Sequence, residues 1–168
     1  KRGIPHTFGN TENIFDRPEV SLTLSLLRVI DNPRRDIPLA AALISPFFGF
    51  TPEDIIEIDD HCANDSIKTL FDRINLYADS SDSPLACKCK KAIEEINALR
   101  LDAETLPTDR IIRQIYSTYS LMSRCDAGGA SALTRLYENA RSFEGDIFKG
   151  LYGYLRYLDD MLESGKTI

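Results

Sequence analysis

Apolar residues recur at helical spacing along almost the whole chain. Between residues 18 and 30 they cover nearly every face, which is typical of a buried helix. Later segments carry them three and four positions apart, as amphipathic helices do. These positions are Leu70, Ile74 and Tyr77; Leu85, Cys89, Ile93 and Ile96; Ile112, Ile115, Tyr119 and Met122; Leu133, Leu136, Tyr137 and Ala140; and Leu151, Leu155, Leu158 and Leu162. The pattern predicts an all-α fold, an irregular arrangement of about eight helices.

Local signals place the ends of these helices. Pro18 suits a first helical position, and Asp36 is expected to cap a second helix that ends at Ile44. Thr51, with Pro52 after it and Asp54 three positions on, predicts a capped third helix.

Two more turns follow from composition. Ser66 is expected to cap a fourth helix, with Ile67 on its apolar face, and Pro107 to open a later helix that runs through Met122. The segment 126–129, which contains Gly128 and Gly129, is predicted to be a flexible turn.

The length of 168 residues predicts one helical domain over residues 1–168. Residues 1–14 are expected to be a linker from a preceding domain, because residues 4–8 form at most a short strand and residues 9–17 lack helical periodicity. The first residue is Lys1, which fits a chain excised from a longer protein.

Composition narrows the function. The apolar fraction of 43% argues against disorder, and the net charge of −6 lacks the basic excess typical of strong nucleic-acid binders. No apolar run approaches the roughly 20 residues that span a bilayer, and no signal peptide is visible, so we expect a cytoplasmic protein without membrane contact.

Candidate chemistry is sparse. Cys87 and Cys89 point to opposite sides of a helix, and Cys62 and Cys125 lie far from them, so we predict reduced thiols and no metal. No phosphate-binding loop occurs, and adjacent acids such as those at 59–60, 94–95 and 159–160 diverge on a helix. The sequence therefore predicts no catalytic residue, no cofactor site and no enzymatic activity in this chain alone.

One long motif resembles a known family. Residues 15–58 read FDRPEVSLTLSLLRVIDNPRRDIPLAAALISPFFGFTPEDIIEI, an acid-bearing turn, an apolar helix, a second short helix and a capped third. This order resembles the start of the 2B subdomain of UvrD-like superfamily 1 DNA helicases, most closely the RecB-like ATP-dependent helicase/nuclease subunits of the AddA type. Residues 140–144 and 148–158 resemble the helix pair that closes 2B, whereas residues 62–105 match only in helical character.

The resemblance implies an accessory role. In that family 2B is inserted in a motor domain of a bacterial helicase that acts in DNA unwinding and double-strand break repair. It would position duplex DNA and dock the motor domains, and a possible further partner is the second helicase/nuclease subunit. ATP and Mg²⁺ would bind the motor domains. Two alternatives stay open, a stand-alone helical protein-interaction module without a DNA role and a small α-helical enzyme.

The resemblance also suggests a DNA-contact site. Gly49, Phe50 and Thr51 stand where UvrD-like helicases carry a Gly-Ile-Gly turn whose amides meet duplex phosphates. A helix N-terminus favours phosphate, but acids in the first turn repel it, so the sequence leaves both a structural turn and a duplex contact open. Lys88 and Lys91 share a helix face and could add phosphate contacts.

The tyrosines near the end of the chain are interpreted as core and interface residues. Tyr152 is assigned to the core face of the last helix. Tyr154 faces elsewhere in this interpretation and is the better candidate for contact with a partner protein.

Overall fold

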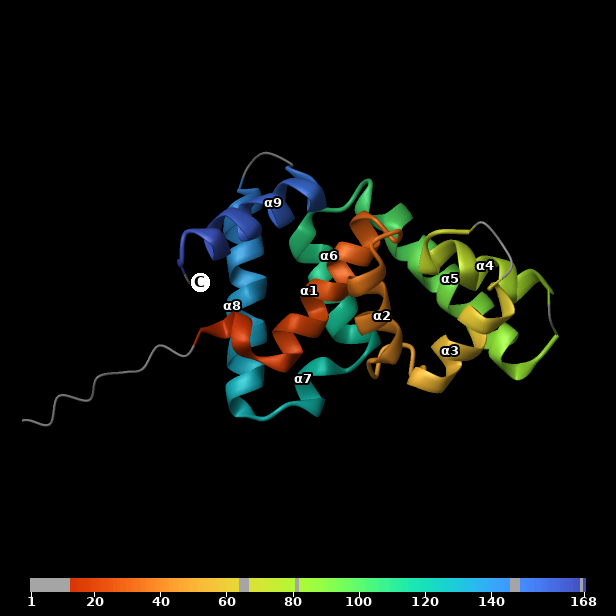
Figure 1. The fold of residues 1–168 in the computed structure, drawn as a ribbon. Coiled ribbons are helices and arrows are strands. Elements are labelled where there is room, and N and C mark those ends of the chain that lie inside the picture. Colours follow the sequence, from red (N-terminus) through yellow and green to blue (C-terminus); the bar gives the residue numbers. More distant parts are fainter. Residues whose placement is uncertain (1–12, 64–66, 81, 146–148, 167) are drawn as a thin grey trace, which may run out of the picture.

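The computed structural model describes residues 13–63, 67–80, 82–145, 149–166 and 168 (Figure 1). These residues form nine α-helices, one 3-10 helix and no strand, which confirms the predicted all-α fold. The elements are η1 (Ile14–Asp16), α1 (Pro18–Asp31), α2 (Asp36–Ile44), α3 (Pro52–His61), α4 (Leu70–Ser80), α5 (Pro84–Ala103), α6 (Thr108–Thr118), α7 (Leu121–Arg124), α8 (Ala127–Glu144) and α9 (Gly150–Glu163). The strand considered for residues 4–8, most of the linker 1–14 and the Ser66 cap lie outside the described residues.

Helix α1 is the centre of the molecule. It contacts η1, α2, α5, α6, α8 and α9, so almost every face of it meets another helix (Figure 1). This explains its apolar sequence, because a helix buried on all sides has no face that water can solvate. Val20, Leu26, Leu27 and Val29 are completely buried.

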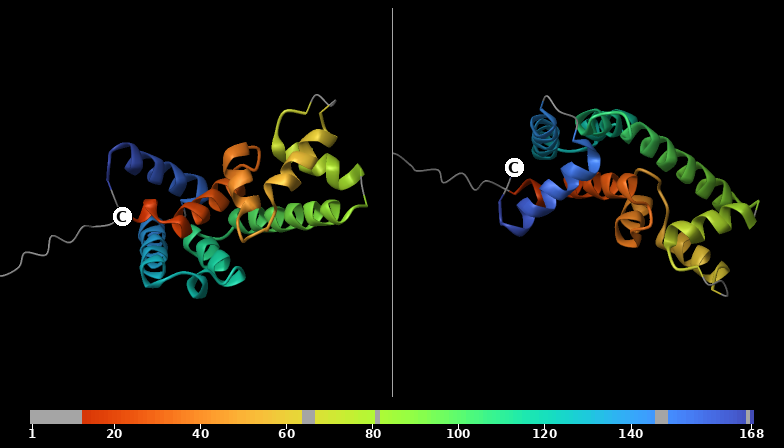
Figure 2. Two further views of the ribbon diagram at one scale, coloured as in Figure 1. Left: turned by 60° about the horizontal axis from the view of Figure 1, so that its bottom comes forward. Right: turned by 90° about the horizontal axis from the view of Figure 1, so that it is seen from above.

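The other helices lie on two sides of α1. Figure 2 shows α3, α4 and α5 at one end of the molecule and α8 and α9 at the other. Helix α5 has 20 residues, about 30 Å at the usual rise, and contacts α1, α4 and α6. It therefore joins the two ends.

The first helices show two small differences from the expected caps. Arg35 is the N-cap of α2, and the Asp36 carboxylate instead accepts a hydrogen bond from the Leu70 amide at 2.9 Å. Helix α4 begins at Leu70, and the Thr69 hydroxyl accepts from the Asp72 amide. Ile67 is therefore not a helical residue, which corrects the expected face of this helix.

The start of the chain also differs from a linker or loop. Residues 14–16 form η1, and the Asn13 side chain accepts a hydrogen bond from the Phe15 amide. Ile14 is 1% exposed and belongs to the core. The sequence did not reveal this because a single turn has too few residues to show a period.

The helix predicted to run from Pro107 through Met122 is divided into α6 and α7. Ser120 has φ +52°, the left-handed region, and this turn ends the hydrogen-bonding pattern of α6. Leu121 is buried after the turn, whereas Met122 is 43% exposed. The prediction that Met122 continues the apolar face of α6 is wrong.

The flexible turn predicted for residues 126–129 is also wrong. Asp126 is the N-cap of α8, and its carboxylate accepts a hydrogen bond from the Gly129 amide at 2.6 Å. Both glycines therefore lie in the first turn of α8. A Cβ atom on Gly129 would lie 2.8 Å from both Cys125 Cβ and Glu19 Oε1, so the glycine allows α1 and α8 to approach closely.

Gly129→Ala is expected to destabilise the protein by about 1–3 kcal/mol, because an overpacked side chain must displace Cys125 or the Glu19 carboxylate. The matched variant is Gly128→Ala, whose Cβ would meet only the Arg17 guanidinium and the Asp126 carboxylate, groups at the ends of side chains. That change should cost less than Gly129→Ala, because Ala also favours a helix by up to about 1 kcal/mol over Gly. Urea unfolding of both variants measures the difference, and equal costs would contradict the close approach.

The two tyrosines of α9 have exchanged roles relative to the prediction. Tyr154 is completely buried, and its hydroxyl lies 3.1 Å from Asn139 Oδ1 and 3.3 Å from the Leu136 carbonyl oxygen. Tyr152 is 63% exposed. The core face of α9 is set by Leu151, Leu155 and Leu158, and Tyr154 lies on this face where Tyr152 does not.

Glu144, the last residue of α8, joins three helices. One carboxylate oxygen accepts hydrogen bonds from the Thr108 amide at 2.8 Å and the Thr108 hydroxyl at 2.7 Å, and the other accepts from the Lys149 amide at 2.9 Å. The side chain therefore satisfies N–H groups at the starts of both α6 and α9. Burial raises the pKa of the Glu144 carboxyl, but these hydrogen bonds outweigh it and hold the pKa below the usual value.

Candidate nucleic-acid interface

The turn between α2 and α3 carries the predicted contact residues. Gly49 has φ +65° and nothing within 4 Å of the position of a Cβ atom, so it is a left-handed residue at an open surface. Its amide donates to the Ser45 carbonyl oxygen at 2.8 Å, and the Phe50 amide donates to the Leu43 carbonyl oxygen, also at 2.8 Å. The turn is therefore fixed by hydrogen bonds to the end of α2.

Thr51 forms the predicted capping box. Its hydroxyl accepts a hydrogen bond from the Asp54 amide at 3.2 Å, and its own amide donates to Asp54 Oδ2 at 3.0 Å. Pro52 has no amide hydrogen to offer. The Glu53 amide is the first-turn donor that neither half of the box uses.

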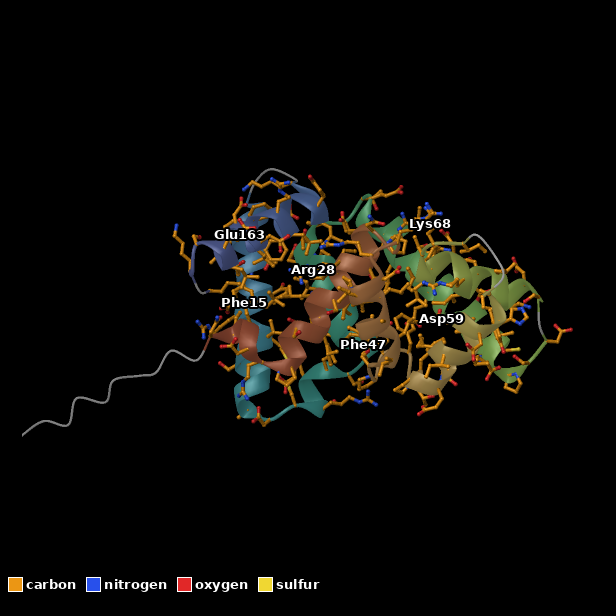
Figure 3. All side chains as sticks on the ribbon, viewed as in Figure 1. Phe15, Arg28, Phe47, Asp59, Lys68 and Glu163 are labelled. Carbon is orange, nitrogen blue, oxygen red and sulfur yellow. The ribbon has the colours of Figure 1, made fainter. Side chains whose placement is uncertain are left out.

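Aromatic packing holds the turn in place. The Phe50 ring is buried. The Phe47 ring lies 4.5 Å from that of Tyr119, centroid to centroid, which ties the end of α2 to the end of α6 (Figure 3). The turn is therefore presented by a rigid base, as a binding surface requires.

Lys88 of α5 reaches this turn. Its ammonium group donates to the Gly49 carbonyl oxygen at 2.7 Å and to Asp54 Oδ2 at 2.8 Å, and it lies 4.5 Å from the centre of the Phe50 ring. The hydrogen bond from Lys88 is the largest cause that lowers the pKa of Asp54, and the Thr51 hydrogen bonds act in the same direction. The repulsion expected from the acid in the first turn is thus partly neutralised by Lys88.

The structure therefore brings together four of the five predicted residues. Gly49, Phe50, Thr51 and Lys88 form one contiguous site, and Lys91 lies exposed one turn further along α5. Sequence reasoning missed Asp54 as the partner of Lys88, because no local spacing connects two residues that are 34 positions apart.

The geometry limits how a phosphate could be bound here. The amides of Gly49, Phe50 and Thr51 all donate to groups of the chain itself, so a phosphate would have to displace one of those acceptors. The ammonium groups are the more accessible donors. The Lys88–Asp54 pair is partly exposed, and exposed ion pairs contribute only about 0–1 kcal/mol, so exchange of Asp54 for a phosphate costs little.

The acids that resembled catalytic or metal-binding pairs serve other roles. Asp59 pairs with Arg73 at 2.8 Å, and Asp159 pairs with Arg28 at 2.8 Å, a bridge between α9 and α1 (Figure 3). In the described part of the chain, no three His, Cys, Asp or Glu side chains are grouped so that they could hold a metal ion.

The cysteines are free thiols in different surroundings. Cys62 and Cys89 are buried, Cys125 is half-buried and Cys87 is exposed. Burial, and to a smaller extent the charge of Asp54, raises the pKa of the Cys89 thiol to about 11, so it is protonated and inert at neutral pH. Among the described residues, no helix has both the length and the apolar character to cross a bilayer.

Comparison with known proteins gives a consistent relationship. No family model matches the chain. A protein of Acetivibrio thermocellus, named as the AddA subunit of an ATP-dependent helicase/nuclease, is 34% identical over 167 residues, which cover 96% of this chain and 13% of that protein. The chain is a relative of one segment of the AddA-type ATP-dependent helicase/nucleases.

Other proteins of that name agree. The one from Heliobacterium modesticaldum is 34% identical over 177 residues, with 96% of this chain and 12% of the relative covered. The one from Lactobacillus acidophilus is 32% identical over 173 residues, with 100% and 14% covered. The chain thus spans about an eighth of the length of these relatives, and the family resemblance seen in residues 15–58 and 140–158 is confirmed.

Proposed function

We propose that this chain is the 2B-type accessory subdomain of a bacterial, cytoplasmic ATP-dependent DNA helicase/nuclease of the AddA type. Its role is to position duplex DNA ahead of the motor domains and to dock those domains or a second subunit, in DNA unwinding and double-strand break repair. The observation that supports this most is the similarity to proteins of that name over 96–100% of the chain. ATP and Mg²⁺ belong to the motor domains in this proposal.

The α2–α3 turn is the proposed duplex contact. The left-handed Gly49 places an open, side-chain-free backbone at the surface, and Lys88 and Lys91 supply positive charge beside it. Lys88 exchanges Asp54 for a phosphate oxygen when DNA arrives, and Thr51 offers its hydroxyl. Contacts of this kind address the sugar–phosphate backbone, so binding should be independent of base sequence and should weaken with salt.

Thr51→Glu is expected to weaken duplex binding about fivefold at low salt, because one added charge near a phosphate costs about 1 kcal/mol in water. The variant also loses the capping hydroxyl, so the control is Thr51→Ala, which removes the cap without adding charge. Fluorescence anisotropy with a labelled duplex, on the full-length parent protein, measures the ratio. Equal affinity of the Glu and Ala variants at low salt would show that the turn is structural only.

The chain alone is expected to bind no ATP. It lacks the glycine-rich loop followed by Lys and Ser or Thr that holds nucleotide phosphates, and the starts of α3 and α8 are closed by their own caps. Isothermal titration with Mg-ATP tests this. Saturable heat at micromolar affinity would contradict the assignment of nucleotide binding to the motor domains.

A further inference from the structure

An apolar groove lies where α6, α7 and α8 meet. Its volume is about 460 Å³, and it is lined by Arg113, Tyr116, Ser117, Met122 and Tyr137. The three helices contact one another pairwise, so the groove walls are fixed. It lies on the side of α1 away from α4, and none of its residues belongs to the α2–α3 turn (Figure 1).

The chain turns in an unfavourable way to make this groove. A left-handed conformation at a residue other than glycine costs on the order of 1 kcal/mol, and Ser120 adopts it in the connection between α6 and α7. As a result Met122 leaves the buried face of α6 and stands 43% exposed in the groove. Methionine is flexible and polarisable, and such side chains adapt to protein partners at binding surfaces.

The polar edge of the groove carries positive charge. Arg113 is the charged lining residue, and Arg110 lies one turn earlier on the same face of α6. Among the described residues, neither arginine has an acidic side chain at ion-pair distance. Arg17, Arg28 and Arg73, in contrast, are paired with aspartates.

We propose that this groove binds a segment of a partner protein that carries a bulky apolar side chain and, within about one helical turn of it, an aspartate or glutamate. The apolar anchor fills the space between Met122, Tyr116 and Tyr137, and the acid pairs with Arg113. The proposal names a surface for the docking part of the proposed function and is independent of the duplex contact. Nucleic acid fits less well, because one lining cation against a net charge of −6 offers little attraction for a polyanion.

The two methionines of the chain give a direct assay. Met122 lines the groove, and Met161 lies on α9, outside it. The probe is a phage-displayed library of short random peptides, followed by synthetic copies of the enriched sequences added to methyl-¹³C-methionine-labelled protein. Enriched peptides should share an apolar anchor and a nearby acid, and they should shift the Met122 methyl signal while leaving that of Met161 in place.

Variants then test the chemistry. Met122→Asp should weaken peptide binding at least about tenfold, and the matched control Ile37→Asp, at an 86% exposed position on α2, should not. Arg113→Glu should reverse the preference from acidic to basic peptides. Thermal unfolding checks that each variant is folded, and duplex affinity should be unchanged in Met122→Asp, which separates this site from the α2–α3 turn.

Four outcomes would overturn the proposal. One is a selection that enriches no peptide, and another is a set of peptides that bind Met122→Asp as well as the unchanged protein. A third is Met122-dependent binding of a single-stranded oligothymidylate without peptide binding, which would make the groove a nucleic-acid site. The fourth is a dimer in sedimentation that Met122→Asp dissociates, which would make it a self-association surface.

Discussion

Tyr154→Ala is expected to destabilise the protein by about 3–5 kcal/mol, the usual cost of removing a buried aromatic ring. Tyr154 has no exposed surface, its ring lies 5.5 Å from that of Phe143 and 6.2 Å from that of Tyr157, centroid to centroid, and its hydroxyl bonds to Asn139. The loss would leave a cavity between α8 and α9. Chemical denaturation followed by circular dichroism measures the change in the free energy of unfolding.

Two controls separate burial from tyrosine chemistry. Tyr152→Ala, two positions away on the exposed face of α9, should change stability by less than about 0.5 kcal/mol. Tyr154→Phe keeps the ring and removes the hydroxyl, so it should cost about 1 kcal/mol. If Tyr152→Ala proved the more damaging alanine variant, the orientation of α9 in this structure would be wrong and the interpretation from sequence would be right.

Sequence reasoning succeeded where a local rule determines the structure. Helix α1 has an apolar surface on nearly every side, so its burial follows from composition alone. The box formed by Thr51 and Asp54 was predicted correctly because both partners lie within one turn, and side-chain capping is a short-range interaction.

It failed where contacts between distant segments decide. Gly128 and Gly129 looked like a flexible turn, since glycine is a poor helix former, but the close packing of Glu19 from α1 requires a glycine at position 129 of α8. The exchange of Tyr152 and Tyr154 has a similar cause. Helical spacing does not say which of two aromatic residues meets a neighbouring helix until that helix is in place.

The candidate site was predicted in part. A local motif located Gly49, Phe50 and Thr51, and the structure adds what no motif could show, that Lys88 from α5 neutralises Asp54 beside them. The groove around Met122 was not predicted, because periodicity continues α6 through the position where Ser120 turns the chain. A backbone conformation of this kind is determined by the packing around it, here by the burial of Leu121.

Glu144→Gln is expected to cost about 2–4 kcal/mol, because buried donors that lose a charged acceptor are destabilised by about 1–3 kcal/mol each. Glutamine keeps the shape of the side chain but replaces one acceptor oxygen with an N–H donor, which would face either Thr108 or Lys149. One of the two helix starts would then lose its cap. The control is Glu138→Gln, a position on the same helix that is only partly buried and where a change below about 0.5 kcal/mol is expected.

The effect should depend on pH in a defined direction. The pKa of Glu144 in the folded protein lies below its ordinary value of 4.5, so the folded state favours the ionised form. The stabilisation is complete above the unfolded pKa and disappears as the pH falls through the lower folded pKa. The difference in unfolding free energy between the unchanged protein and Glu144→Gln should therefore be constant near neutral pH and shrink below about pH 4.5. A difference that grew on acidification would mean that Glu144 is protonated in the folded protein, and the carboxylate could not then accept hydrogen bonds from both helix starts with both of its oxygens.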